Sequence, residues 1–464
     1  MTVTPQTPAH AQLDAWVDAH FDEQVAFLQQ LVRVPTDTPP GNNTPHAERT
    51  IALLADMGYQ AERFDVPAAD VQAEGLQSIT NLIVRRHFGQ ADSNGQRAGK
   101  TIALNVHGDV VPPGEGWTHD PYGGEVVGDL ATGRIYGRAT AVSKGDFSTF
   151  TFALRALESL AATSNQPNGP NLKGSVELHF TYDEEFGGNV GPGWLLKHGH
   201  TKPDLMIAAG FSYQVVVAHN GCLQLEVTVQ GDMAHAAIPD SGTDALQGAT
   251  HIMNALYQLN RDYLQVTSGV EGITHPYLNI GLISGGTNTN VIPGKVVLKL
   301  DRRMIPEEDP EQVEMSLRET IAQAAASFNP PRGGKALQVD VRRMLLARSM
   351  KPLPGNAPLV AAIQQHGQQV FGEPIPAVGT PLYTDVRLYG EHGIPGVIYG
   401  AGPRTVRESN AKRADEHLEL ADLRRATKVV ARALGDLLGG SVKHGGDPAQ
   451  FQPEDVRLKS LVSN

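Results

Sequence analysis

Apolar residues near the start of the chain recur with the period of an α-helix. They run over residues 13–32, and Pro35 follows, so the spacing predicts one helix that ends before this proline. Two short apolar runs, 102–106 and 176–180, are typical of buried strands. A helical pattern over 148–160 lies between them, and this order of strand, helix and strand indicates a mostly parallel sheet.

The middle of the chain follows a different pattern. Four segments there alternate apolar and polar residues: 222–232, 277–286, 295–304 and 337–346. Such alternation is typical of antiparallel strands with one face toward water. Two helical patterns, over 244–259 and 310–326, separate these segments and predict helices that cover the other face.

The change of pattern predicts two domains. After residue 347 the alternation of helix, strand and loop resumes, and it continues to a helical pattern over 422–438. The expected fold class is therefore α/β. Residues 1–221 and 348–464 form a main domain with a mostly parallel sheet, and residues 222–347 form an inserted α+β domain. A chain of 464 residues is long enough for both.

Composition excludes several classes of protein. The net charge is −12, with 38 Lys and Arg against 50 Asp and Glu, whereas a general nucleic-acid binder would be basic. No apolar run reaches the ~18–20 residues of a membrane span. Cys222 is the single cysteine, so no internal disulfide is possible, and the N-terminus does not read as a secretory signal. We therefore expect a cytoplasmic protein that binds neither nucleic acid nor membranes.

Histidine and acidic residues follow both predicted strands of the main domain. His107 and Asp109 belong to the sequence HGDVVP after the first, and the acidic residues 183–185 belong to TYDEEFGG after the second. Ligands of parallel sheets bind at the carboxyl ends of strands, where these residues would meet. A carboxylate beside a metal-bound histidine fixes its tautomer, and paired carboxylates can serve as base and ligand. The alternatives are a strand-end turn and a solvated acidic turn.

These motifs are part of a longer ordered series. HGDVVP, YDEEFGG, GDMAHAAIPDSGTDAL, GGTNTNVIPG, DRRMIPEE, TDVR and ADEHLEL occur in this order along the chain. In this the chain resembles the co-catalytic zinc metallopeptidases that include acetylornithine deacetylase, succinyl-diaminopimelate desuccinylase, aminoacylase and glutamate carboxypeptidase. The resemblance implies a catalytic domain with an inserted lid that usually forms a dimer interface. It also implies two zinc ions and hydrolysis of an amide in a small substrate that carries a carboxylate.

The resemblance also assigns roles to residues after the two strands. His107 matches a zinc ligand, and Asp109 matches the carboxylate that orients it. Glu184 matches the general base that deprotonates water, and Glu185 matches a ligand of one zinc ion.

Three further matches lie in the lid. His235 matches the histidine that reaches into the site of a partner subunit and stabilises the oxyanion, so a homodimer is implied. Asn290 and either Arg302 or Arg303 match groups for the substrate's carboxylate, a role that suits a guanidinium. Ion pairing on the lid surface is the alternative for the arginines.

Three of the five metal-ligand positions depart from the family's pattern. The five read His107, Val142, Glu185, Gly210 and Lys412, where the family has two histidines and three carboxylates. The family's set carries about −3 and needs dications when partly buried. In this chain the one carboxylate and the one ammonium cancel.

The charge balance leads to the hypothesis that this chain holds no zinc ion or only one. A single ion would rest on His107 and Glu185 with help from Asp146 or His219. The leading prediction is an amidohydrolase with an altered site, in which Glu184 is the base and His235 and Lys412 stabilise charge. We expect Lys412 beside Glu184 and Glu185, and a purely structural Lys–Glu pair is the alternative for this residue. Two alternatives stay open: a non-catalytic binding protein on the same fold, and a metal-dependent amidohydrolase whose site is rearranged around Asp146.

Overall fold

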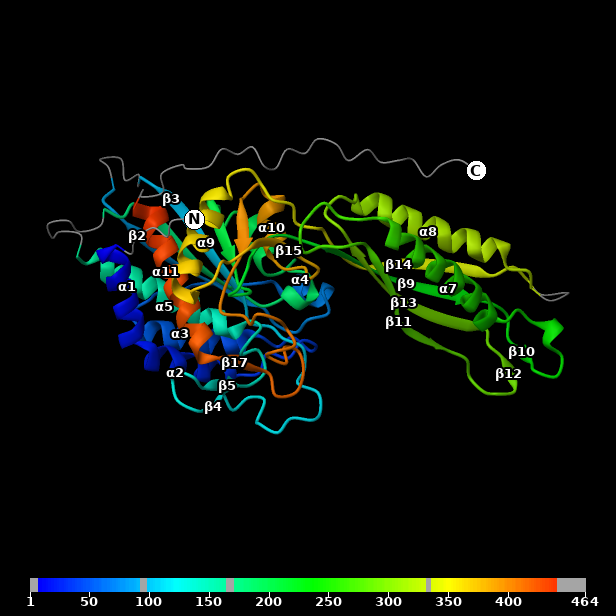
Figure 1. Cartoon of the computed structure of the whole chain (residues 1–464). Coiled ribbons are helices and arrows are strands. Elements are labelled where there is room, and N and C mark those ends of the chain that lie inside the picture. Colours follow the sequence, from blue (N-terminus) through cyan, green and yellow to red (C-terminus); the bar gives the residue numbers. More distant parts are fainter. Residues whose placement is uncertain (1–6, 92–97, 164–170, 331–334, 440–464) are drawn as a thin grey trace.

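The computed structural model of the chain describes residues 7–91, 98–163, 171–330 and 335–439. Helices and strands form two layered units that lie beside each other (Figure 1). The C-terminal part of the predicted main domain, 440–464, lies outside the described residues.

The larger unit is built on an eight-stranded mixed sheet. Its strands, in spatial order, are β1 (Glu62–Asp65), β2 (Thr80–Phe88), β6 (Gly174–Thr181), β3 (Lys100–His107), β7 (Leu205–Ala208), β16 (Gly396–Ile398), β8 (Val215–His219) and β15 (Ala377–Thr380). The central strands β6, β3, β7 and β16 are parallel neighbours, and β8 and β15 are parallel to each other. The predicted α/β class with a mostly parallel sheet is confirmed at this core.

Both faces of the large sheet are covered, as expected for a parallel core. Strand β7 contributes apolar side chains to both faces of the sheet. Leu205 and Ile207 pack into the large cluster on one face, while Met206 and Ala208 pack into a second cluster on the other. Each face is apolar because alternate side chains of a strand point to opposite sides.

Helices form the two outer layers of the larger unit. One layer packs around the sheet's larger cluster and contains α1 (Pro8–Ala19), α5 (Lys144–Ala161), α9 (Ala357–Phe371) and α11 (Leu420–Gly439). The opposite cluster includes residues of α6 (Pro192–Lys197) and α10 (Val386–Glu391). The remaining helices are α2 (Phe21–Val32), α3 (Thr44–Asp56) and α4 (Ala68–Ala73).

The helix predicted over 13–32 is in fact two helices. His20 ends α1 and precedes α2, with backbone angles (φ −114°, ψ 16°) outside the helical range. Its side-chain Nδ1 lies 2.8 Å from the carbonyl of Trp16, and its ring stacks on the indole at 4.0 Å. This local hydrogen bond closes α1, a competition with the backbone that apolar spacing does not reveal.

The smaller unit is a four-stranded antiparallel sheet. Its strands, in spatial order, are β11 (Tyr277–Gly285), β13 (Lys295–Met304), β9 (Gly221–Gln230) and β14 (Gln338–Ala347). Helices α7 (Ala245–Asp262) and α8 (Pro310–Ser327) share its apolar core. Asp244 and Asp309 cap these helices by accepting backbone N–H groups of their first turns. The domain boundaries at 222 and 347 stay predictions, although β9 begins at Gly221 and β14 ends at Ala347.

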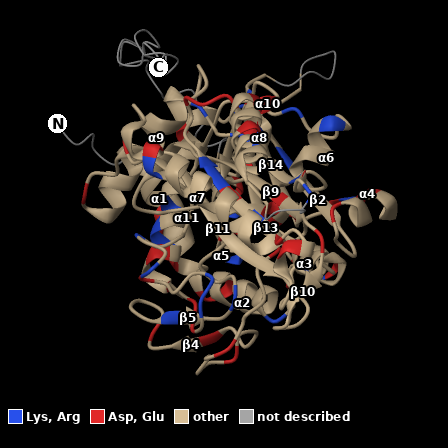
Figure 2. Ribbon diagram, turned by 90° about the vertical axis from the view of Figure 1, so that its right-hand side faces the viewer, with Lys and Arg blue, Asp and Glu red and all other residues tan. Residues whose placement is uncertain are grey.

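The fold also contains two small sheets. The pair β10 (Ala234–His235) and β12 (Val291–Ile292) lies at the end of the smaller unit away from the large sheet (Figure 1). Strands β17 (His417–Glu419), β5 (Arg134–Tyr136) and β4 (Glu125–Val127) form the other. Basic and acidic residues are interspersed on the ribbon, for example on the neighbours β4 and β5 (Figure 2). Among the described helices, none is both long and apolar enough to cross a membrane.

Candidate active site

Parallel strands bring the motif residues to one edge of the large sheet. Strand β3 ends at His107 beside the end of β6 at Thr181, and β7 and β16 end next to them. A cavity of about 450 Å³ opens at this edge and is bordered by Glu184 of the large unit and Arg303 of β13. Its size suits a small molecule. The predicted meeting of the motifs at the carboxyl ends of strands is therefore found.

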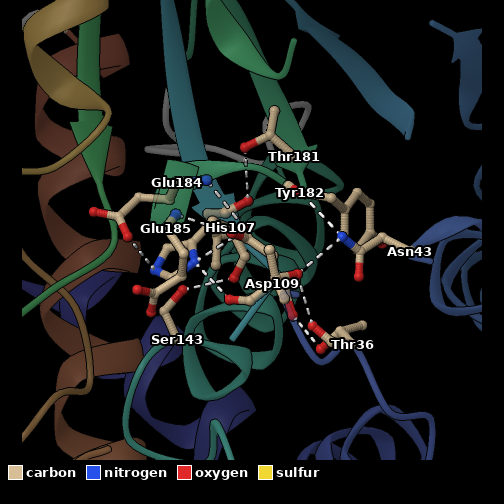
Figure 3. A network of polar contacts seen from close by, with 12 residues as sticks. Thr36, Asn43, His107, Asp109, Ser143, Thr181, Tyr182, Glu184 and Glu185 are labelled. Carbon is tan, nitrogen blue, oxygen red and sulfur yellow. Dashed lines mark hydrogen bonds and ion pairs between the residues drawn. The ribbon is translucent and has the colours of Figure 1, made fainter. Parts of the chain in front are cut away.

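Asp109 organises the two motifs. Its fully buried carboxylate accepts the backbone N–H of Glu184 at 3.2 Å and that of Glu185 at 2.9 Å (Figure 3). His107 Nδ1 lies 3.0 Å from the backbone carbonyl of Asp109 and 3.4 Å from its carboxylate. The opposite ring nitrogen, Nε2, lies 3.9 Å from the carboxylate of Glu184. One buried aspartate thus holds the histidine and the acidic turn together.

Neighbouring loops hold this arrangement from outside. Ser143 donates its hydroxyl to the carbonyl of His107 at 2.8 Å, and Thr36 donates to the carbonyl of Gly108 at 2.6 Å (Figure 3). Asn43 donates its amide to the carbonyl of Tyr182 at 3.1 Å, just before the acidic turn. Each bond satisfies a buried backbone carbonyl near the strand ends, which restrains the loops that carry the site.

Burial and charge shift the pKa values of the two central groups. Burial, together with the nearby charge of Glu185, raises the pKa of Glu184 to about 7, although His107 opposes this shift. Burial would lower the pKa of His107, but the charge of Glu184 and the hydrogen bond to Asp109 outweigh it and raise this pKa to about 10. At neutral pH, Glu184 is poised to accept a proton beside an imidazolium.

Lys412 lies against the acidic turn. Its Nζ donates to Glu185 at 2.7 Å, and its side chain is about half exposed at the cavity. Burial would lower the pKa of this ammonium, but the charges of Glu185 and Glu184 outweigh it, and the pKa is raised. The cation predicted beside Glu184 and Glu185 is therefore in place.

Asp146 borders the cavity, yet its carboxylate is already engaged. One oxygen accepts the backbone N–H of Gly210 at 3.1 Å and the other accepts that of Ala401 at 2.7 Å. Burial raises the pKa of Asp146 to about 7. A β-carbon placed on Gly210 would lie 2.2 Å from Ile398 Cγ2, so this position has no room for a side chain unless the neighbour shifts.

Only one of the two lid arginines borders the cavity. Arg302 is buried within the smaller unit, where it pairs with Glu308 and lies 4.1 Å from the ring of Tyr263. Arg303 faces the cavity, and its Nε lies 2.7 Å from Asp301. Within the described residues, Nη1 of Arg303 makes no hydrogen bond.

His235 and Asn290 are far from the cavity of their own chain. His235 belongs to β10 and pairs with Val291 of β12, at the outer end of the smaller unit (Figure 1). The carbonyl of Asn290 accepts the N–H of Ala236 at 3.0 Å. The structure therefore does not bring these two residues to the other predicted site residues.

His219 is buried and lies outside the cavity lining. Its Nδ1 is 2.8 Å from the carbonyl of Asn220, while its Nε2 has no partner among the described residues. Burial lowers its pKa to about 4, so the ring is neutral at pH 7. This position suits a hydrogen-bonded core histidine better than the supporting ligand role considered from the sequence.

Two residues at the site were not singled out from the sequence. Tyr383 borders the cavity, and burial together with the charge of Glu184 raises the pKa of its phenol, which stays protonated. Glu416 is buried, pairs with Arg138 at 2.6 Å and accepts the N–H groups of Ala141 and Val142, both at 3.2 Å. Tyr383 lies two residues before Asp385 of the TDVR motif, and its closeness to this motif was the one sequence feature that could have indicated it.

Comparison with known proteins assigns the chain to a family. Residues 103–436 match peptidase family M20/M25/M40. The chain belongs to this family. Its members among the relatives below are enzymes that include deacetylases, desuccinylases and peptidases, so the chain belongs to a family of amidohydrolases and peptidases that act on small molecules.

Individual relatives agree with this assignment. The chain is 28% identical over 425 residues to acetylornithine deacetylase of Myxococcus xanthus, covering 89% of this chain and 97% of that one. It is 30% identical over 294 residues to succinyl-diaminopimelate desuccinylase of Gluconobacter oxydans (strain 621H), covering 61% and 67%.

Solved structures share the fold. An M20 family metallo-carboxypeptidase from Sulfolobus solfataricus superposes with a TM-score of 0.68 at 19% identity, covering 91% of this chain and 100% of the other. A dinuclear metal-binding peptidase of the M20 family from Bacillus subtilis gives a TM-score of 0.61 at 16% identity, covering 91% and 99%.

Proposed function

We propose that the chain hydrolyses an amide, or a related carbon–nitrogen bond, in a small substrate that carries a carboxylate, and that it does so at a site depleted of metal. The observation that carries this proposal is the placement of Glu184. This buried carboxylate borders the cavity, has a pKa raised to about 7 by burial, and lies beside the cations of His107 and Lys412.

The residues present do not fit the two-zinc centre of the family. Lys412 and Glu185 already form an ion pair, and a dication beside them would be repelled by the ammonium. Val142 has no donor atom, and Gly210 has no side chain. Both oxygens of Asp146 are occupied by backbone N–H groups, so the alternative of a site rearranged around this residue is not favoured.

In the proposed mechanism the chain's own groups carry out the hydrolysis. Glu184 takes a proton from water while the water oxygen attacks the carbonyl carbon of the substrate. The negative charge that develops on the carbonyl oxygen faces Lys412, His107 and the phenol of Tyr383. Glu184 then returns the proton to the nitrogen as the carbon–nitrogen bond breaks, which yields a carboxylic acid and an amine.

Arg303 is the proposed partner of the substrate's carboxylate. It borders the cavity, and its Nη1 is open to a second acceptor besides Asp301. A guanidinium binds carboxylates with directional hydrogen bonds. Arg302 is not proposed for this role because its charge is balanced by Glu308 inside the smaller unit.

A second copy of the chain is proposed to complete the site. His235 and Asn290 lie at the outer end of the smaller unit, away from the cavity of their own chain. The edge strand β11 exposes Leu282 and Ile283, apolar side chains that a partner would cover. Both features support a homodimer through the lid.

Mixing two inactive variants tests the dimer. Glu184→Gln and His235→Ala chains should each be inactive alone, and mixed dimers should regain part of the activity because one site of each contains both intact residues. Analytical ultracentrifugation gives the mass in parallel. A monomeric protein, or mixed dimers without activity, would contradict this part of the proposal.

The buried, unpaired Cys222 supports the cytoplasmic location that we propose. It carries no disulfide, and burial raises the pKa of its thiol to about 12. A reducing compartment would leave it unchanged.

Metal analysis tests the main proposal. Protein purified without chelators should contain at most one zinc ion per chain, and turnover of N-acyl amino acids should persist in 1,10-phenanthroline. Two zinc ions per chain together with loss of activity in chelator would overturn the metal-depleted site. Binding of these compounds without any turnover would instead identify a binding protein.

A further inference from the structure

Part of the cavity is lined by apolar side chains, some of which stand at or beside the positions where the family pattern has metal ligands. We call this surface the apolar wall and define it by five residues that border the cavity: Val142, Phe211, Ile398, Val406 and Ala411. Val142 and Phe211 stand at, or next to, two departing ligand positions, and Ala411 directly precedes the third.

The segments of the apolar wall are joined to one another. Gly402 donates its N–H to the carbonyl of Gly210 at 2.7 Å, which fixes Phe211 beside the strand that ends at Ile398. Ala411 donates its N–H to the carbonyl of Val406 at 3.1 Å. The wall is therefore a structured surface built from loops that follow several strands.

Nearby polar groups are directed into the protein. Both oxygens of Asp146 accept backbone N–H groups, as described above. Glu416 accepts hydrogen bonds from Arg138 and from three backbone N–H groups, those of Ala141, Val142 and Lys412. A ligand group lying on the wall therefore meets methyl groups and an aromatic ring rather than carboxylates.

Apolar side chains also remain exposed at the cavity. Val406 is 42% exposed and Leu382, which also borders the cavity, is 41% exposed. Scattered apolar residues on a surface are ordinary, but two that border one cavity next to an apolar wall favour a ligand that covers them. Burying apolar area contributes about 25 cal/mol per Å².

We propose that the site takes N-acyl amino acids, or similar amides, whose acyl group is an uncharged alkyl or aromatic chain. This inference rests on the proposed function, which places the carboxylate at Arg303 and the amide at Glu184. The acyl group then extends away from Arg303 onto the apolar wall. The succinyl group named in some relatives ends in a carboxylate, which would lose its water against the methyl groups and the aromatic ring of this wall, while the nearby Lys412 is already paired with Glu185.

Binding measured without turnover tests the inference. Isothermal titration of the full-length Glu184→Gln protein uses N-acetyl-, N-butanoyl-, N-hexanoyl- and N-succinyl-alanine. Each added pair of methylenes should lower Kd by about tenfold, as expected for buried methylenes. N-succinyl-alanine should bind at least about tenfold more weakly than N-butanoyl-alanine.

A matched pair of variants locates the effect. Val406→Asp should weaken the binding of N-hexanoyl-alanine by about tenfold and that of N-acetyl-alanine by about twofold or less. Val127→Asp, on the exposed strand β4, should change neither. The inference would be overturned if Kd did not change with the length of the acyl chain, or if N-succinyl-alanine bound more tightly than N-butanoyl-alanine. It would also be overturned if the two variants had equal effects, or if no compound bound. Acyl-chain dependence in a wild-type protein without turnover would support it while removing the proposed hydrolysis.

Discussion

Two clusters in which histidine and carboxylate side chains meet differ in how their charges are satisfied. The first is the cavity cluster of His107, Asp109, Glu184, Glu185 and Lys412 at the ends of the strands. The second is the helix cluster of His10, His366 and Asp436, where α1, α9 and α11 meet.

In the helix cluster each carboxylate oxygen has its own partner. His10 Nε2 lies 2.8 Å from one oxygen of Asp436, and His366 Nε2 lies 2.8 Å from the other. His10 Nδ1 accepts the N–H of Thr7 at 3.4 Å, which places the ring proton on Nε2, toward Asp436. Burial opposes ionisation of Asp436, but these hydrogen bonds outweigh it, and the pKa of the carboxyl group is lowered.

The helix cluster looks like a metal site by distance and yet is better explained as a clamp. Its three ligand atoms lie within 4.8 Å of one another, the one such group found in the described residues. A metal at Nε2 of His10 would require the ring proton on Nδ1, which already faces an N–H donor. Hydrogen bonds to the two rings satisfy Asp436 without an ion.

In the cavity cluster the carboxylates outnumber the groups that satisfy them. Glu184 has a pKa raised to about 7 because it is buried near Glu185, and it borders open space. A carboxylate held in this state can exchange a proton with a bound molecule. Proximity of histidine and carboxylate therefore does not distinguish the two clusters, whereas unsatisfied charge beside a cavity does.

Removing the base should have the largest effect. Glu184→Gln keeps the size of the side chain but cannot accept a proton at neutral pH, so kcat should fall about 10³-fold. Steady-state kinetics with an N-acyl amino acid measures this fall. Glu319→Gln on the exposed surface of α8 is the matched control and should be unaffected. Full activity of Glu184→Gln would mean that another group is the base.

Removing the cation of the cavity cluster should have the next largest effect. Lys412→Met keeps the length of the side chain but leaves Glu185 and Glu184 without their ammonium, so kcat/KM at pH 7 should fall about 10²-fold. The pKa of Glu184 should rise, which moves the acid limb of the pH profile to higher pH. Lys197→Met, at an exposed position of α6, serves as the control. An unmoved acid limb would argue that Lys412 is a structural partner of Glu185 alone.

The wild-type pH profile should show both titrations of the cavity cluster. Glu184 must be ionised to act as a base, so kcat/KM should drop about tenfold for each pH unit below about 7. His107, with a pKa raised to about 10, supplies positive charge until that pH, where a second limb should begin. Rates between pH 5 and pH 11 measure both limbs. An acid limb near pH 4 would mean that Glu184 is not the group observed.

The sequence alone predicted the helices and strands whose apolar residues recur with a regular period. Periodicity predicted β3, β6, α5 and the alternating strands and helices of the smaller unit, because burial imposes its period directly on the residues. The ordered motifs likewise led to His107, Asp109 and Glu184, which the parallel strands bring together as expected.

What the sequence did not reveal depends on contacts between distant segments. Arg302 and Arg303 are adjacent in the chain, yet only the second borders the cavity, because alternate residues of β13 face opposite sides. From the sequence, Asp146 was a candidate replacement metal ligand. In the structure, however, its two oxygens accept hydrogen bonds from the backbone N–H groups of Gly210 and Ala401. The helix cluster joins His10 to Asp436, more than 400 positions later in the chain, so no local sequence pattern predicts it.

The smallest expected effect concerns stability rather than catalysis. Asp436→Asn should lower the free energy of unfolding at pH 7 by about 1–3 kcal/mol, because the amide's NH₂ faces a ring N–H and one buried hydrogen bond is lost. Urea unfolding measures this loss, and kcat of the folded protein should change by less than about twofold. Asp240→Asn, exposed in the smaller unit, is the control.

The pH dependence of this loss follows from the direction of the pKa shift. Because the pKa of Asp436 is lowered in the folded protein, its contribution is complete above the usual carboxyl range, near pH 4, and declines as the pH falls through and below that range. The wild-type and Asp436→Asn proteins should therefore differ more at pH 7 than at pH 3.5. A loss of kcat without a loss of stability would contradict the clamp and link the helix cluster to the cavity cluster, because a clamp between α1, α9 and α11 acts on unfolding and not on the reacting groups.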